Sequence, residues 1–219
     1  MVSKNGFKIE SVTYGNHIFK PKQVYSFVPP YSPLNKLWDY IIVTIKSIPN
    51  NPVPNIIRKG ISSSHTKIVL LQNGIHIENS CAAEFPQNPL ISGVTYIAVV
   101  QKEQGVITHT GLNNIVIGAF KGKHINPSVW EKADEAAKVL VDILKLKESS
   151  SVDWVEDIQM KRWHKIVWNA GNKSKTAFFL LLFIITTISV LNGFVNAKRR
   201  RRKKKKKFHI FLQFFNSFS

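Results

Sequence analysis

The fold is decided by one stretch, DYIIVTIK at residues 39–46. Its β-branched, apolar residues are continuous rather than alternating, as expected for a parallel strand that is covered on both faces. A second such run, KIVLL at residues 67–71, follows a predicted helix at residues 52–61 that prolines open. Strand, helix and strand at this spacing predict a βαβ unit, so we expect an α/β fold in which the two strands are adjacent and parallel.

Further elements are predicted on both sides of this unit. Residues 6–28 predict short strands and turns, and the proline-rich residues 28–33 predict a linker. In chain order, the later elements are a helix at 75–85, a hairpin of strands 93–100 and 105–110 turned at 102–104, a third strand at 114–118, an amphipathic helix capped by Ser128 and running to about 147, a strand at 152–155, and a helix opened by Asp157.

Charge and cysteine content exclude some classes of function. The chain of 219 residues has a net charge of +18, but ten of its 31 basic residues form one block at 198–207. Residues 1–172 hold 19 basic and 13 acidic residues, a net charge of only +6. A uniform basic run attracts nucleic acid without specificity, so no specific nucleic-acid partner is predicted. Cys81 is the only cysteine, which excludes an intramolecular disulfide.

Two polar side chains are predicted at one edge of the sheet. Lys46 ends the first strand and Asn73 follows the second, and ligands of open α/β sheets bind at the carboxyl edge of the strands. A lysine there can hold a cofactor phosphate or a substrate oxygen, and an Asn amide offers both a donor and an acceptor. Taken singly, each also fits an ordinary role, a solvated lysine or an Asn-Gly turn.

The stretch richest in chemical groups is RWHKIVWN at residues 162–169. On a helix, Lys165 and Asn169 are four residues apart and share one side. An ammonium and a carboxamide one turn apart can bind a ketone oxygen, with the lysine as general acid; the alternative is an amphipathic helix with both groups in solvent. His109 has no partner at metal-ligand spacing, so we interpret it as structural and predict no metal site.

Five short blocks follow one another in a fixed order. They are Thr-x-Lys at 44–46, Gln-Asn-Gly at 72–74, Gly-Val-Thr at 93–95, His-Thr-Gly at 109–111 and RWxKxxxNA at 162–170. Their order and spacing, over about residues 5–171, resemble the ketopantoate reductase (2-dehydropantoate 2-reductase) family. The front segment NGFKI at 5–9, with Tyr14-Gly15, is similar to fungal-type members of that family. Each block alone is weak, but five in the right order make a specific signal.

The resemblance implies an oxidoreductase that reduces ketopantoate to pantoate with NADPH, on the route to pantothenate. It implies that Lys165 is the catalytic lysine that donates to the substrate carbonyl and that Asn169 binds substrate. It further implies that Asn73 contacts both substrate and cofactor, that Lys46 binds the cofactor, and that Ala98 makes a backbone contact with it. NADP and ketopantoate or pantoate are thus the implied partners, in the cytoplasm.

The sequence departs from the family at both ends. No Gly-x-Gly-x-x-Gly loop for the cofactor pyrophosphate occurs. We therefore expect residues 1–171 to form a partial Rossmann-like, NADP-binding domain that lacks its first βα unit, in an inactive or incomplete enzyme.

Residues 172–219 are foreign to the family and comprise an apolar segment at 177–195 and the basic tail at 198–207. One interpretation is a transmembrane helix at 177–195 with the basic tail in the cytosol, which would make the chain a single-pass membrane-anchored binding protein with a non-catalytic domain. The other is a segment translated from an intron or a shifted frame. No secretory signal is recognised at the N-terminus.

Overall fold

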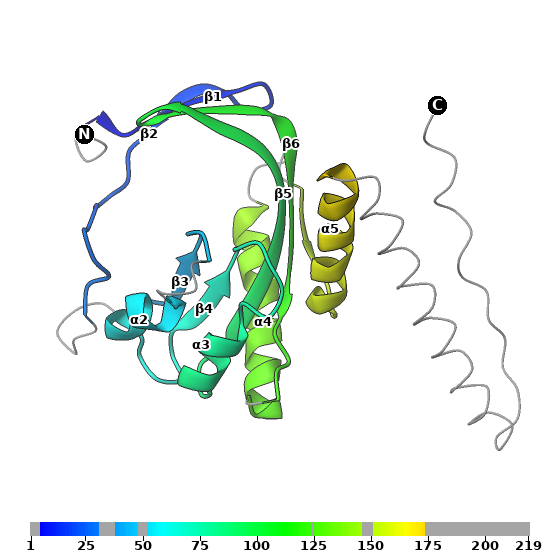
Figure 1. The fold of residues 1–219 in the computed structure, drawn as a ribbon. Coiled ribbons are helices and arrows are strands. Elements are labelled where there is room, and N and C mark those ends of the chain that lie inside the picture. Colours follow the sequence, from blue (N-terminus) through cyan, green and yellow to red (C-terminus); the bar gives the residue numbers. More distant parts are fainter. Residues whose placement is uncertain (1–4, 31–37, 48–51, 124, 146–150, 174–219) are drawn as a thin grey trace, which may run out of the picture. The chain divides into compact units, whose positions relative to one another are not determined.

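The structure, a computed structural model, describes residues 5–30, 38–47, 52–123, 125–145 and 151–173 (Figure 1). The chain divides into two compact units, Met1–Ile166 and Val167–Ser219. The segments predicted at 177–195 and 198–207 lie outside the described residues. Within the described ranges, no helix has the length and apolar character needed to cross a membrane.

The first unit is built on a mixed, seven-stranded sheet of order β2-β1-β6-β5-β4-β3, in which β7 also pairs with β6. The strands are β1 (Phe7–Ser11), β2 (Gly15–Phe19), β3 (Tyr40–Val43), β4 (Lys67–Leu70), β5 (Leu90–Glu103), β6 (Val106–Ala119) and β7 (Ser151–Trp154). β3, β4 and β5 are parallel, whereas β5 and β6 are antiparallel. β1 and β7 pair in parallel with successive parts of β6.

The predicted βαβ unit is confirmed. β3 and β4 are adjacent and parallel, with Tyr40 opposite Lys67 and Val43 opposite Leu70. The connection contains α2 (Val53–Ile57), which begins with a proline in its first turn, and the 3-10 turn η1 (Arg58–Gly60). β3 ends at Val43, three residues earlier than the predicted end at Lys46. Val43 pairs with Leu70, the last residue of β4. Lys46 therefore lies on the loop that follows β3.

The hairpin is longer than predicted, and the expected third strand at 114–118 is wrong as a separate element. Those residues are the second half of β6, which continues from Val106 to Ala119 and forms a long curved pair with β5 (Figure 1). Thr110, Gly111 and Leu112 form a bulge, since Val99 pairs with His109 but Ile97 pairs with Asn113. Gly111 has a φ of +127°, which L side chains rarely adopt.

Two helix boundaries also differ from the prediction. The helix expected at 75–85 is only α3 (Asn79–Glu84), because His76 has a φ of +60° and cannot continue an α-helix. α4 (Pro127–Leu144) is capped by Asn126 rather than by Ser128: the Asn126 side chain accepts from the Ser128 backbone N–H at 2.9 Å. α5 (Ile158–Lys173) begins after Asp157 as predicted, and this carboxylate accepts from the Met160 N–H at 3.1 Å.

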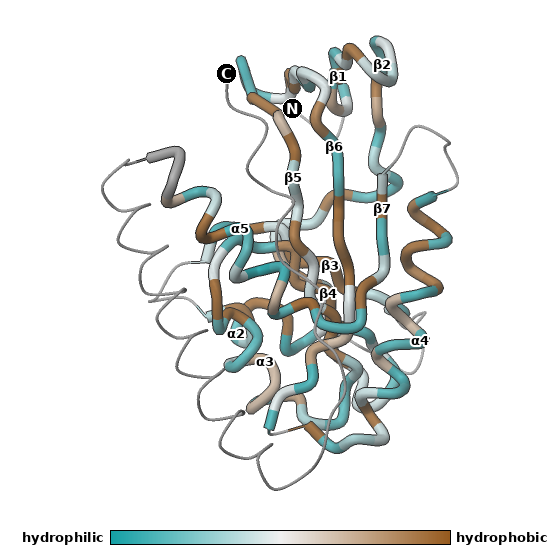
Figure 2. Tube along the Cα trace, turned by 90° about the vertical axis from the view of Figure 1, so that its right-hand side faces the viewer, coloured by the Kyte–Doolittle hydropathy of each residue, from teal (hydrophilic) through white to brown (hydrophobic). Residues whose placement is uncertain are grey.

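Helices cover both faces of the central strands. Val69, Ile91 and Ile117 pack against α4, in a cluster that includes Ala137 and Leu140. The neighbouring residues of the same strands point to the opposite face, where Ile68, Leu70 and Leu90 pack with α2 and α3 and where Val94 and Val116 pack with Ile158 of α5. Figure 1 shows α4 and α5 on opposite sides of the β5–β6 pair, and Figure 2 shows apolar residues concentrated along the central strands.

Candidate functional site

Lys165 reaches the carboxyl edge of the parallel strands from the side of α5. Its ammonium donates to Oδ1 of Asn73 at 2.8 Å and to the backbone carbonyl of Thr95. The ammonium also lies 5.3 Å from the ring centroid of Tyr96, a distance at which the face of the ring attracts a cation. The structure thus brings Lys165 and Asn73 together from positions 92 residues apart in the sequence.

Lys46 lies on the loop next to the one that carries Asn73. The side-chain amide of Gln72 donates to the carbonyl of Ile45 at 2.8 Å. This bond joins the loop after β3 to the loop after β4. Ile45 is the neighbour of Lys46 in the sequence, and Gln72 is the neighbour of Asn73. The Lys46 side chain itself is exposed, so both predicted residues lie at the same edge and Lys46 faces solvent there.

The other two predicted residues are less closely tied to this edge. Ala98 lies on β5 opposite the bulge of β6, and its carbonyl accepts from the Thr110 hydroxyl at 3.3 Å. Asn169 is on α5, but it falls in the second unit, Val167–Ser219. Its predicted role beside Lys165 therefore stays a prediction.

A buried ionic cluster beneath Asn73 was not predicted from the sequence. Arg162 is 3% exposed and Glu78 is fully buried, and their charged groups are 2.7 Å apart. Glu78 Oε1 also accepts from the Ser92 hydroxyl at 2.6 Å and from the Gln159 amide at 3.0 Å. We call Arg162, Glu78, Ser92 and Gln159 the Arg162 cluster.

All three nitrogens of the Arg162 guanidinium donate hydrogen bonds. Nε donates to Ser92 at 2.7 Å, Nη1 donates to the carbonyls of Gln72 and Gly74 at 2.9 and 3.0 Å, and Nη2 donates to the carbonyls of Leu70 and Gly93, both at 3.2 Å. Three of these carbonyls lie at the end of β4 and in the turn after it, and the fourth, that of Gly93, lies near the start of β5. Gly74 has a φ of +117°, which explains why glycine follows Asn73 in this turn.

The electrostatic environment favours proton release from Lys165. Burial lowers the pKa of the Lys165 ammonium below its ordinary value, and the positive charge of Arg162 lowers it further. Burial also lowers the pKa of Arg162, but Glu78 raises it through its charge and hydrogen bond. An arginine remains charged at any physiological pH, so Lys165 is the titrating member of the two.

Other reactive groups and cavities do not join this site. Burial raises the pKa of the Cys81 thiol to about 12, which leaves it a packed, unreactive residue near neutral pH. His109 is buried and its Nδ1 lies 2.8 Å from the Ser11 hydroxyl, in agreement with a structural role. Across the described residues, no group of three His, Cys, Asp or Glu side chains could hold a metal ion.

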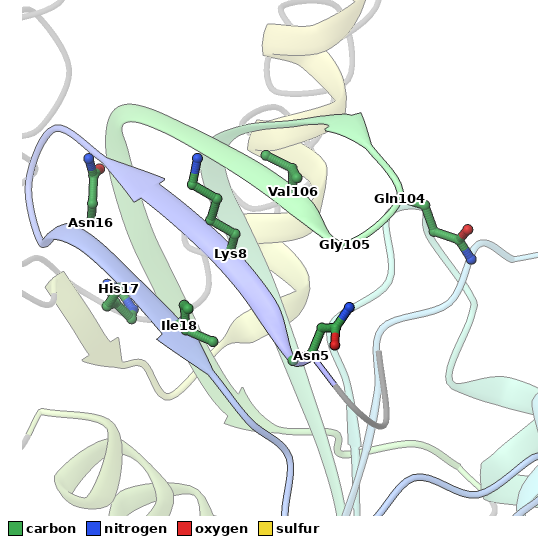
Figure 3. Close-up of a pocket in the computed structure, with 9 residues that line it drawn as sticks. Asn5, Lys8, Asn16, His17, Ile18, Gln104, Gly105 and Val106 are labelled. Atoms are coloured by element: carbon green, nitrogen blue, oxygen red, sulfur yellow. The ribbon is translucent and has the colours of Figure 1, made fainter. Parts of the chain in front are cut away.

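A cavity of about 400 Å³ lies at the far end of the β5–β6 hairpin. Figure 3 shows Lys8, Asn16 and His17 of the β1–β2 hairpin on one side and Gln104 and Gly105 of the turn on the other. None of the predicted site residues lines it. Lys8 is paired there with Glu10 at 2.8 Å on the surface, and the Lys165 edge remains the candidate site.

Comparison with known proteins identifies the family. The family described as Ketopantoate reductase PanE/ApbA matches residues 1–122, which is more than half of the chain. The chain belongs to the ketopantoate reductase family. This confirms the family that the five sequence blocks predicted, and with it an α/β fold whose curled mixed sheet resembles the Rossmann-like domain of ketopantoate reductases.

Relatives within and around this family are longer than the chain. The Saccharomyces cerevisiae protein YDL144C is 30% identical over 195 residues, which cover 80% of this chain and 53% of that protein. The crystal structure of 2-dehydropantoate 2-reductase from Methylococcus capsulatus matches with a TM-score of 0.63 and 30% identity, over 78% of this chain and 50% of that one. A D-mandelate dehydrogenase solved with NADH and anilino(oxo)acetate shares the fold, with a TM-score of 0.58 and 20% identity over 77% of this chain and 49% of that one. The chain therefore spans about half the length of these relatives.

Proposed function

We propose that this chain carries the lysine side of a 2-keto acid reductase site of the 2-dehydropantoate 2-reductase type. One observation carries the proposal: the ammonium of Lys165 is fixed by Asn73 and by the Thr95 carbonyl at the carboxyl edge of the sheet. Family membership supports the same reaction class. Residues 1–171 would correspond to the nucleotide-binding domain of the family, and residues 172–219 would lie outside it.

Lys165 would act as the proton donor to the ketone oxygen. An ammonium has three N–H donors, and within the described part of the chain Asn73 and Thr95 accept two of them. The third is left to hydrogen-bond a substrate carbonyl. A lowered pKa of Lys165 makes its ammonium a stronger acid near neutral pH, which favours proton transfer to the developing alkoxide. Asn169 remains a proposed substrate contact.

Asn73 and Lys46 at this edge, and Ala98 farther along β5, would suit one end of a nicotinamide dinucleotide but not its centre. Oδ1 of Asn73 accepts from the Lys165 ammonium, and the Asn73 amide nitrogen keeps two N–H donors, which suit a carboxamide or ribose oxygen. Lys46, exposed on the neighbouring loop, suits a ribose or a phosphate, and the Ala98 carbonyl has a second lone pair besides the one used by Thr110. We propose a nicotinamide cofactor, NADPH by family resemblance, which supplies the hydride when bound. The 219 residues contain no glycine loop for its pyrophosphate.

Replacing Lys165 is expected to abolish most ketopantoate binding. A hydrogen bond to a charged group contributes about 1.5–3 kcal/mol, so Lys165→Ala should weaken ketopantoate at least about tenfold in isothermal titration calorimetry on the full chain. Lys161→Ala is the matched control, because Lys161 has the same charge and lies one turn earlier on α5. Equal losses in the two variants would show general attraction of an anion to a basic surface and would contradict the proposal.

The same titration has a defined pH dependence. The ammonium form of Lys165 donates to the substrate, and its pKa is lowered from the ordinary lysine value. Ketopantoate affinity should therefore be full below this pKa and decline as the pH rises through it, before exposed lysines lose their charge. In the Lys165→Ala variant this alkaline decline should disappear.

A further inference from the structure

The buried guanidinium of Arg162 lies beside both groups that hold Lys165. It donates to the carbonyls of Gln72 and Gly74, the two residues that flank Asn73. It also donates to the carbonyl of Gly93, two residues before Thr95 on β5. Arg162 precedes Lys165 by three residues on α5, so the two side chains leave neighbouring positions on one face of the helix.

We propose that Arg162 is a positioning residue for Lys165, with Glu78 as its buried counter-charge. The guanidinium fixes the Asn73 turn and the Thr95 segment at the separation at which both accept from one ammonium. A role of Arg162 in catalysis rests on the proposed function, whereas the positioning of Lys165 by Arg162 does not. A planar fork with five donors can hold carbonyls from two strands at once, which the point charge of a lysine cannot do.

The charges around Lys165 make this arrangement measurable. In the described residues, the titratable or charged groups at its ammonium are Arg162 on its own helix and Tyr96 on β5, and Glu78 lies beyond Arg162. The charge of Arg162 lowers the pKa of Lys165, and the opposite charge of Glu78, 2.7 Å from Arg162, is expected to offset part of that effect. Loss of the fork should release Lys165 to water, whereas loss of the Glu78 charge should leave Lys165 in place beside an unbalanced cation.

Competitive acetylation of the full chain tests the proposal, with the pH midpoint of Lys165 determined by mass spectrometry of its peptide. Arg162→Lys keeps the charge but removes the fork. Its Lys165 midpoint is expected to rise, by on the order of one pH unit, towards that of exposed lysines because burial no longer lowers the pKa. Arg58→Lys is the matched control: Arg58 forms a surface pair with Glu84 at 3.0 Å, and the same change there should leave the midpoint unchanged.

Glu78→Gln provides an independent arm that decides the matter if Arg162→Lys does not fold, as judged by circular dichroism. This variant keeps the shape of the side chain and should lower the Lys165 midpoint by on the order of one pH unit, whereas Glu84→Gln should not. If the pH midpoint of Lys165 in folded Arg162→Lys, or in Glu78→Gln, equals that of the unchanged chain, the proposal is overturned. Neither ketopantoate nor cofactor enters this experiment, so its failure and a failure of ketopantoate binding are separate results.

Discussion

The purified 219-residue chain is expected to oxidise no NADPH in the presence of ketopantoate. Hydride transfer requires the nicotinamide and the ketone carbon to be held in reacting geometry, and such alignment supplies about 7–11 kcal/mol of the barrier. In the proposed site, the residues at the Lys165 edge would contact only the nicotinamide end of the cofactor. The 219 residues contain no Gly-x-Gly-x-x-Gly sequence, and we therefore expect the cofactor pyrophosphate to be held too weakly for this alignment.

Absorbance of NADPH at saturating ketopantoate measures this directly. A full-length 2-dehydropantoate 2-reductase in the same buffer shows that the assay works. The Lys165→Ala variant of this chain distinguishes turnover at the Lys165 site from turnover by a contaminating reductase. Turnover that needs ketopantoate and vanishes in Lys165→Ala would show that the chain alone is a working enzyme and that the expectation is wrong.

Removal of the buried arginine is expected to cause the largest loss of stability among single changes at this site. Arg162→Met leaves the fully buried carboxylate of Glu78 without its cation and removes the donor from four backbone carbonyls. Breaking a buried ion pair by removing one partner costs about 3–5 kcal/mol. The free energy of unfolding, from urea titration of the full chain followed by circular dichroism, should fall by that amount.

Two further variants separate the causes of this loss. Arg58→Met breaks an ion pair whose side chains are half exposed, and a surface pair contributes only about 0–1 kcal/mol. In Arg162→Met/Glu78→Met the unpaired carboxylate is gone, so part of the stability should return, but the carbonyls still lack their donor. If Arg162→Met cost no more than Arg58→Met, the Arg162 cluster would not be the structural link described here.

The sequence predicted the part of the fold that depends on local pattern. The continuous β-branched runs at 39–46 and 67–71 predicted a parallel pair because a strand covered on both faces has no polar side. Because the two strands were predicted to be parallel neighbours, Lys46 and Asn73 were predicted to lie at the same edge of the sheet. The hairpin was less predictable: Thr110-Gly111 has the composition of a turn, and only the pairing of β6 with β5, β1 and β7 shows that it is a bulge inside one strand.

The Arg162 cluster was missed because its members come from three separate segments, the start of α3, β5 and α5. Charged residues inside predicted helices are usually solvated, so Glu78 and Arg162 carried no sign of burial. One signal was present: Ser92 is a polar residue within the otherwise apolar start of β5, on the face that also buries Leu90 and Val94. A buried hydroxyl needs a partner, but the sequence does not say which one.

Protection of Lys165 by ketopantoate is the most direct test of the lysine-centred site. The full chain is acetylated with and without saturating ketopantoate at a pH near the Lys165 midpoint, and the modification of each lysine is quantified by mass spectrometry. Ketopantoate is expected to suppress acetylation of Lys165 while Lys161, one turn away on the same helix, reacts as before. Unchanged acetylation of Lys165, or equal protection of Lys161 and Lys165, would contradict a keto acid site at the Asn73–Thr95 edge.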